Sequence, residues 1–155
     1  MKDSFKKPTF DTMSIIRIAP ICNGKIYVVP RPSTDGTQHL DIPIEETIEQ
    51  WSPKSEKAIR KIKDKYRLHI HTQNSPRYCV HYKLASHNEE TVYLYVLPLN
   101  HEDEIQFQKG EFVTAEAITN EDHPCSPYLQ KEIDLLGMAA ELWNNYFPTN
   151  KKGME

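Results

Sequence analysis

The sequence predicts an α+β fold, and three kinds of segment carry this prediction. Two apolar runs on either side of Asn23-Gly24 predict a β-hairpin, because both turn residues tolerate positive φ. Segments 68–71, 77–83 and 91–99 are apolar in alternation or throughout, which is typical of strands in a partly buried sheet. Apolar residues at helical spacing predict one helix near the middle of the chain and one near its end, both docked on that sheet.

Length and composition favour a single domain. The 155 residues are enough for one sizeable core, and we expect a domain over 12–147 between flexible tails at 1–11 and 148–155. The formal net charge of -3 gives no broad basic surface, so no nucleic-acid partner is expected. No apolar run reaches the roughly 20 residues of a membrane span, so no membrane partner is expected either. Three cysteines without motif spacing, and an N-terminus without an apolar signal segment, favour a reduced, cytoplasmic protein.

Proline and polar residues predict where the strands end. Pro20 and Pro30 cannot donate to a β-ladder, which predicts an edge or a bulge at both positions. The segment 32–38 is a loop of polar residues and glycine that could border a pocket. A turn is predicted at 87–89, and the acidic segment 100–108 predicts a further loop.

The central helix is predicted to begin with Ser52 as the N-cap and Pro53 in its first turn. Its apolar stripe should dock on the sheet. The residues of that stripe are Ala58, Ile59, Ile62 and Tyr66. The opposite face is charged and should meet solvent or a ligand. It carries Glu56, Arg60, Lys61, Asp64 and Lys65.

Two further helices are marked by capping residues. After a short strand at 111–113, Thr114 is the predicted N-cap of a brief helix. The closing helix should begin after Ser126 and run to about Trp143. One face of it is apolar, with Leu129, Ile133, Leu136 and Ala140.

The order of these elements resembles that of the Nudix hydrolases, whose sequence box reads G-x5-E-x7-R-E-U-x-E-E-x-G-U. Asp41-Ile42-Pro43 stands where that family has its Leu-Pro pair, and the segment 60–68 aligns with the helical end of the box. The resemblance covers about Ile15 to Trp143. It implies a Nudix-like α/β/α sandwich with a mixed β-sheet between helices. Three residues of the helical end match the box, namely Arg60, Ile62 and Leu68.

The chain departs from the box where the family binds metal. The family's helix carries carboxylates at three positions on one face, which hold divalent cations against a diphosphate. Here these positions are Lys61, Asp64 and Lys65, so two of the three acids have become cations. The family's Gly-Gly pair is replaced by Ile44 and Glu45. The Nudix box is therefore degenerate, and no metal cofactor is expected in the family's manner.

The resemblance leads to a first hypothesis, that the protein binds or regulates through a phosphorylated or nucleotide-like ligand without hydrolysing it. Arg60, Lys61 and Lys65 could contact a phosphate directly, in place of a metal. Arg31 aligns with a residue that lies near the substrate in the family. The alternative for all four is that they are solvated surface residues.

A second hypothesis is an active Nudix-type hydrolase of nucleoside diphosphate-linked compounds with relocated ligands for Mg or Mn. One of the loop glutamates would act as base, and Asp64→Asn would abolish turnover. A third hypothesis is an unrelated interaction module, which could also form an oligomer. The acids available for the second hypothesis are Glu45, Glu46, Glu49, Glu56 and Asp64.

Two strands after the central helix offer the side chains of a conceivable zinc site. His69 and His71 would share one face of a strand, and Cys79 and His81 one face of the next. If those strands were neighbours, the four side chains could converge. The alternative is a set of polar side chains on the outer face of a half-buried sheet.

Overall fold

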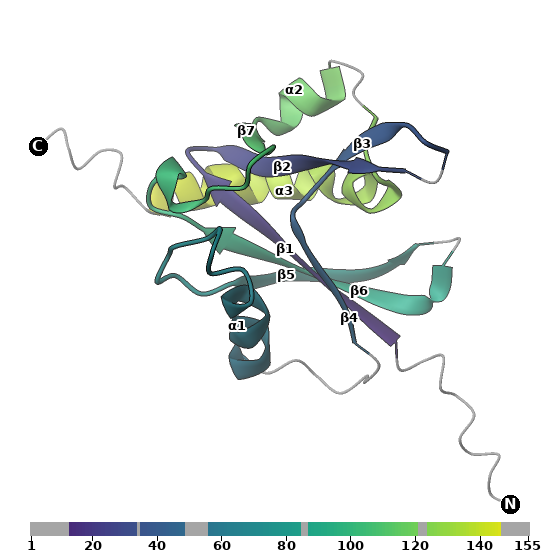
Figure 1. Cartoon of the computed structure of the whole chain (residues 1–155), viewed down its shortest axis with the longest axis horizontal. Helices are drawn as coiled ribbons and strands as arrows, with labels where there is room; N and C mark the ends of the chain where they lie inside the picture. The colour runs from purple at the N-terminus through teal and green to yellow at the C-terminus, as the bar shows by residue number, and fades with distance from the viewer. Residues whose placement is uncertain (1–12, 34, 49–55, 85–86, 121–123, 147–155) are drawn as a thin grey trace, which may run out of the picture.

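The computed structural model describes residues 13–33, 35–48, 56–84, 87–120 and 124–146 (Figure 1). Both predicted tails and the predicted start of the central helix at Ser52 and Pro53 lie outside the described residues, as does Glu49. The elements in chain order are β1 (Met13–Cys22), β2 (Lys25–Pro32), β3 (Gln38–Asp41), β4 (Ile44–Ile48), α1 (Glu56–Asp64), β5 (Arg77–Leu84), β6 (His87–Pro98), the 3-10 turn η3 (Glu102–Glu104), β7 (Glu111–Val113), α2 (Ala115–Asn120) and α3 (Pro127–Tyr146).

The strands form one mixed sheet with β1 at its centre. The order is β3-β2-β1-β6-β5, with β4 paired to β1 and β7 to β2. β1 runs parallel to β6 and antiparallel to β2 and β4. Its first half pairs with β4 as far as Ile18, and its end pairs with β2 from Ile21. Pro20 therefore lies where β1 changes partners, inside the sheet. Of the two positions predicted for it, an edge or a bulge, the edge is wrong.

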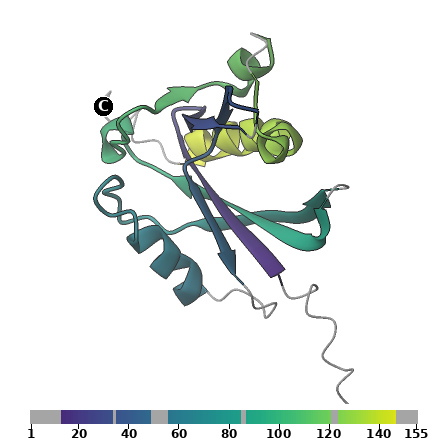
Figure 2. The ribbon, with the colours of Figure 1, turned by 45° about the vertical axis from the view of Figure 1, so that its right-hand side comes forward.

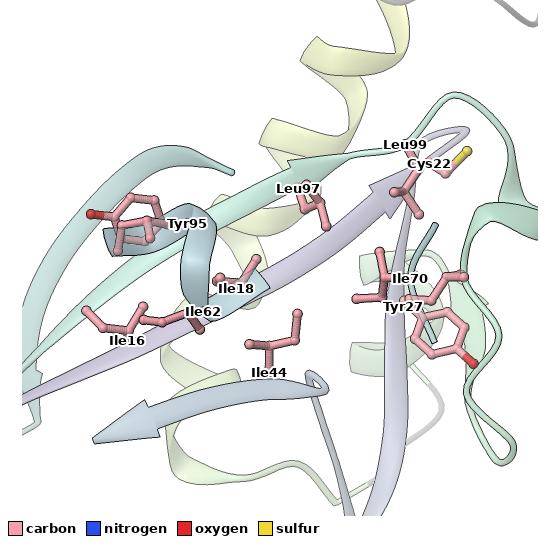
Figure 3. Packing of buried hydrophobic residues seen from close by; sticks show 12 residues of the cluster. Ile16, Ile18, Cys22, Tyr27, Ile44, Ile62, Ile70, Tyr95, Leu97 and Leu99 are labelled. Carbon is pink, nitrogen blue, oxygen red and sulfur yellow. The ribbon is translucent and has the colours of Figure 1, made fainter. Parts of the chain in front are cut away.

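Helices cover both faces of the sheet, α1 on one side and α2 with α3 on the other (Figures 1 and 2). The alternation of β1 divides the core accordingly. Ile16 and Ile18 pack toward Ile59 and Ile62 of α1, as Figure 3 shows for three of these residues. The opposite layer joins β1, β2 and β6 to α2 and α3, through residues such as Ala19, Ile21, Ile26, Leu94, Leu129, Ile133 and Leu136. The predicted α+β class and the α/β/α sandwich with a mixed sheet are confirmed.

The turn and cap predictions hold where the structure describes them. Asn23 and Gly24 have φ of 57° and 76°, the left-handed pair that a tight hairpin requires. Thr114 Oγ1 accepts from the N–H of Ala117 at 3.0 Å, and Ser126 Oγ accepts from the N–H of Leu129 at 3.0 Å. Both hydroxyls thus satisfy an orphan donor at the start of a helix.

Two local predictions are wrong. The segment 68–71 is not a strand, because turns continue from α1 and the carbonyl of Tyr66 accepts from the N–H groups of His69 and Ile70 at 2.8 and 2.9 Å. Its alternation also misleads, since Leu68 is 81% exposed while Ile70 is buried. The segment 87–89 is not a turn, because β6 already begins at His87 and pairs it with Leu84.

Candidate functional site

A pocket of about 530 Å³ opens on the α1 side of the sheet. It lies where β2, the β3–β4 connection, the turn after α1 and the segment before β7 come together. Cations, aromatic rings and carboxylates all contribute to its lining, so both charged and planar groups could be held there. The lining residues are Val29, Arg31, Asp41, Pro43, Glu45, Tyr66, Phe107, Gln108 and Lys109.

Arg31 is the cation on the β2 wall. Strand alternation puts it on the same face as Val29, which packs against the α1-side core. Its Nη2 donates to the carbonyls of Ile42 and Pro43 at 3.1 and 2.8 Å, and its Nε lies 3.8 Å from Asp41 Oδ2. These contacts hold the guanidinium in one position at the pocket wall, while the Arg31 side chain as a whole is 39% exposed.

Another part of the pocket wall is the segment 107–109, which is placed by a close approach between Gly110 and β2. A Cβ at this position would lie 2.2 Å from the ring of Tyr27, so glycine allows the segment 107–110 to close against β2. The Tyr27 hydroxyl also donates to the carbonyl of Phe107 at 2.9 Å. The ring of His69 stacks on Phe107 with centroids 4.5 Å apart. Phe107 and the neighbouring Lys109 are thereby placed at the pocket.

Tyr66 supplies a second ring. Its centroid lies 6.3 Å from that of Phe107, with the planes tilted by 52°. Burial raises the pKa of the Tyr66 phenol, and the negative charge of Glu46 adds to this effect. The hydroxyl therefore stays protonated near neutral pH and is able to donate a hydrogen bond.

Beside the pocket, the fully buried Arg17 gathers three carboxylates from distant parts of the chain. Its Nε and Nη2 each donate to Glu132 at 2.8 Å. Its Nη2 and Nη1 donate to Asp41 at 2.8 and 3.5 Å, and Nη1 also donates to Glu45 at 2.7 Å. These five bonds equal the donor capacity of a guanidinium. Since Asp41 and Glu45 also line the pocket, this Arg17 cluster connects the pocket to α3.

The charges of the Arg17 cluster are unequal, with three carboxylates around one guanidinium. Burial by itself would lower the pKa of Arg17, but its bonds to Glu132 and the nearby charges raise it, so Arg17 remains a cation. Burial raises the pKa of Glu132, against the opposing effect of Arg17. The Tyr82 hydroxyl donates to Glu132 Oε2 at 2.7 Å and satisfies part of the remaining acceptor capacity.

The predicted ligand-binding cations on α1 lie elsewhere. Arg60 Nη2 donates to Ser75 Oγ at 2.6 Å, and Lys61 is an exposed residue of the helix. Lys65 Nζ lies 2.9 Å from Glu46 Oε1 in an exposed ion pair. These three residues do not line the pocket, so of the predicted set only Arg31 does.

Among the residues that the structure describes, the predicted acids do not come together as a metal site. Glu45 binds Arg17 and Glu46 binds Lys65, while Asp64 lies 3.8 Å from Lys63 and Glu56 is exposed. Within the described ranges, no group of three or more His, Cys, Asp or Glu side chains could hold a metal ion. The described residues therefore do not fit the Mg or Mn centre that the second hypothesis requires.

The side chains of the conceivable zinc site do not come together either. His69 lies in the turn after α1 and stacks on Phe107. His81 Nδ1 lies 2.6 Å from the Tyr78 hydroxyl on β5. Burial raises the pKa of the Cys79 thiol, which disfavours the thiolate that zinc needs.

Comparisons with known proteins agree on the architecture. No protein-family model and no curated protein sequence matches the chain. Among solved structures, DR0079 from Deinococcus radiodurans is similar with a TM-score of 0.58 and 14% identity, over 80% of this chain and 82% of that one. An ADP compounds hydrolase gives 0.56 at 10% identity over 86% and 73%, and a MutT of Aliivibrio salmonicida or Vibrio cholerae gives 0.54 at 10% over 83% and 98%. The fold is Nudix-like.

In this Nudix-like fold, the segments that align with the Nudix pattern contribute Asp41, Pro43, Glu45 and Tyr66 to the pocket. Sequence reasoning missed several other residues that shape it. Gly110 gave one signal, because it is the first glycine after Gly36 and stands next to Lys109. Arg17 gave another, since a lone cation among isoleucines predicts a buried, paired charge. No local pattern distinguishes Phe107.

Within the described residues, no helix is long and apolar enough to cross a membrane.

Proposed function

We propose that this protein binds a small phosphorylated, nucleotide-like ligand in the pocket of its Nudix-like fold, without a divalent metal and without hydrolysing it. The observation that carries the proposal is the pairing of a fixed guanidinium, Arg31, with the two rings of Tyr66 and Phe107 in one pocket. An anionic group and a planar ring are the two parts of a nucleotide that these side chains suit.

The cations support an anionic ligand. Arg31 Nη1 has no hydrogen-bond partner among the described residues, so it is free to donate to a phosphate oxygen. Lys109 is exposed at the rim and adds a mobile positive charge. Because Arg31 and Lys109 both line the pocket, a phosphate group bound there would lie near two positive charges.

The rings and carboxylates support a nucleobase. Tyr66 and Phe107 offer apolar surface to a planar ring. Glu45 lines the pocket with its side chain 35% exposed and binds Arg17 through Oε1, so its second oxygen suits the amino group of a base. A ligand with an amino-bearing ring at one end and a phosphate at the other would use all these groups.

The state of the acids favours binding over hydrolysis. Glu45 and Glu46, the loop acids that would replace the lost box residues, already pair with Arg17 and Lys65. A divalent cation would have to compete with these two cations for the same carboxylates. The Nudix-like fold does not decide the matter, since the similar structures include an ADP compounds hydrolase and the C-terminal domain of mouse MUTYH in complex with human PCNA.

The proposal is tested by thermal melting with a panel of nucleoside mono- and diphosphates, in Mg, in Mn and in EDTA, while phosphate release is recorded. A bound ligand at a hundredfold excess over its Kd stabilises the native state by about 2.7 kcal/mol, which a melt resolves. We expect a shift that is the same in EDTA and in Mg, with no release of phosphate.

Two lysine variants make this test specific to the pocket. Lys109→Gln should weaken binding about tenfold, since one charge-assisted hydrogen bond is lost. Lys61→Gln is the matched control, because Lys61 is an equally exposed lysine that does not line the pocket. A shift that needs Mg and releases phosphate would instead establish the hydrolase, and the absence of any shift across the panel would refute both.

A further inference from the structure

A second hollow, of about 610 Å³, lies between α2 and α3. Both helices pack on the face of the sheet opposite α1, so this hollow is separate from the nucleotide-like pocket (Figures 1 and 2). Two of its lining residues are large, exposed apolar side chains. Met138 is 68% exposed and Leu142 is 59% exposed, one turn apart on α3.

The hollow arises because α3 has two different faces. The stripe containing Ile133, Leu136 and Ala140 is buried on the sheet. The outward stripe carries Met138 and Leu142 at a spacing of four residues.

The approach of α2 turns this outward stripe into a groove. A Cβ at Gly137 would lie 2.8 Å from the Cβ of Ala115, so glycine lets the start of α2 come close to α3. The wall on that side is α2, which contributes Ala115 and Glu116 to the lining. We call this hollow the α2–α3 groove.

The charges around the α2–α3 groove have one sign. Glu116, Asp134 and Glu141 line it, and no lysine, arginine or histidine of the described chain does. Single exposed apolar residues are normal on a protein surface. Two adjacent ones in a concave groove with an acidic border are a pattern typical of an interaction site.

We propose that the α2–α3 groove docks a basic amphipathic helix of a partner protein. The apolar side chains of that helix would lie on Met138 and Leu142, and its lysines or arginines would meet Asp134, Glu141 and Glu116. The unbranched side chain of Met138 can adapt to different apolar partners.

The same charges argue against a second copy of this chain as the occupant. In a symmetric contact through this groove, the carboxylates of one copy would face those of the other. Like charges a few ångströms apart repel, so a basic helix from another protein fits better than this surface does. The inference is independent of the nucleotide-like ligand, which would occupy the opposite side of the sheet.

The test uses the full chain and a fluorescent synthetic peptide of leucine and lysine at helical spacing, with fluorescence anisotropy as the measurement. A peptide in which glutamate replaces every lysine is the matched control. We expect the lysine peptide to bind, more weakly as salt rises, and the glutamate peptide not to bind. Failure of the lysine peptide to bind, or equal binding of both, would overturn the proposal.

Variants locate the binding on the groove. Leu142→Gln should weaken the lysine peptide about tenfold, as expected for a central apolar anchor. Asp134→Asn together with Glu141→Gln should weaken it and reduce its salt dependence. Leu68→Gln is the control, because Leu68 is 81% exposed but lies after α1.

All of these side chains are exposed, so the variants should melt like the wild type. Equal binding by Leu142→Gln and the wild type would place the peptide elsewhere and refute the docking site. Light scattering of the free protein tests whether a second copy of this chain occupies the groove instead. A dimer that Leu142→Gln dissociates would assign the groove to a second copy and overturn the proposed helix.

Discussion

Helices α1 and α3 pack on opposite faces of the same sheet, yet they use charge in opposite ways. α1 carries the segment that aligns with the Nudix box, and its Arg60, Lys61 and Asp64 are exposed. Its buried Lys63 donates to the backbone carbonyls of Thr72 and Asn74 and to no buried carboxylate of the Arg17 cluster. α3 carries no recognisable motif, yet its Glu132 is only 2% exposed and binds the buried Arg17 through two hydrogen bonds.

This difference shows that a charged residue can align with a motif and still contribute little to the stability of the fold. Exposed ion pairs contribute little, because water and salt screen them. Breaking a buried pair leaves an uncompensated charge without solvent, which is costly. The charges that organise this protein are therefore those of the Arg17 cluster, and the box residues on α1 are mostly surface.

The largest effect should come from removing the centre of the buried cluster. Arg17→Met would leave the buried Glu132 without its cation and Asp41 with the longer contact to Arg31, and we expect it to lower the free energy of unfolding by about 3–5 kcal/mol. Urea unfolding followed by circular dichroism measures the change. The control is Arg60→Met on α1, which removes an exposed arginine. If the two variants lost equal stability, the contrast between the two helices would be wrong.

A smaller effect should appear as a change in pH dependence. Burial raises the pKa of Glu132 above its ordinary 4.5, so the native state holds this proton more tightly than the unfolded chain does. Its contribution to stability is therefore fully present below 4.5 and is lost as pH rises through the raised pKa. Glu132→Gln should remove this loss, so that the difference in stability between variant and wild type changes with pH in that window.

The control for Glu132 is another carboxylate of α3, the exposed Asp134. Asp134→Asn is the same kind of carboxylate-to-amide change at an exposed residue outside the Arg17 cluster, so it controls for the substitution itself. Urea unfolding at a series of pH values gives both comparisons. A constant offset between Glu132→Gln and the wild type would mean that Glu132 has an ordinary pKa in the native state.

The smallest effect is expected on α1. Lys65→Gln breaks the exposed pair with Glu46, and Asp64→Asn removes the last box acid. Neither variant should shift the melting temperature measurably, and neither should change nucleotide affinity, since neither residue lines the pocket. A Mg-dependent phosphate release that disappears in Asp64→Asn would show that the box still works.

Elements with strong local signals could be predicted from the sequence. Asn23-Gly24 predicted the hairpin because its backbone needs positive φ, and Thr114 and Ser126 predicted helix starts because their hydroxyls cap nearby N–H groups. The segment 68–71 was missed for the converse reason. Its alternation resembled a strand, but hydrogen bonds to the carbonyl of Tyr66, just after α1, made it a series of turns.

The candidate site could be predicted only in part. Arg31 was found because its place at the end of β2 matched the Nudix pattern, and the pocket does include it. The lysines of α1 were predicted to reach a ligand because helical periodicity tells which residues share a face, but not what that face meets. Lys109 and Phe107 were missed because their place depends on the contact between Gly110 and Tyr27.

By itself, the sequence determined the α+β class, the β1–β2 hairpin, the strands β5 and β6 and the apolar stripes of α1 and α3. These depend on residue type and on neighbours within a few positions of the chain. Only the tertiary structure decided which charges are buried together. Arg17 and Glu132 are 115 positions apart, and they meet because the register of β1 and the packing of α3 bring them to one place.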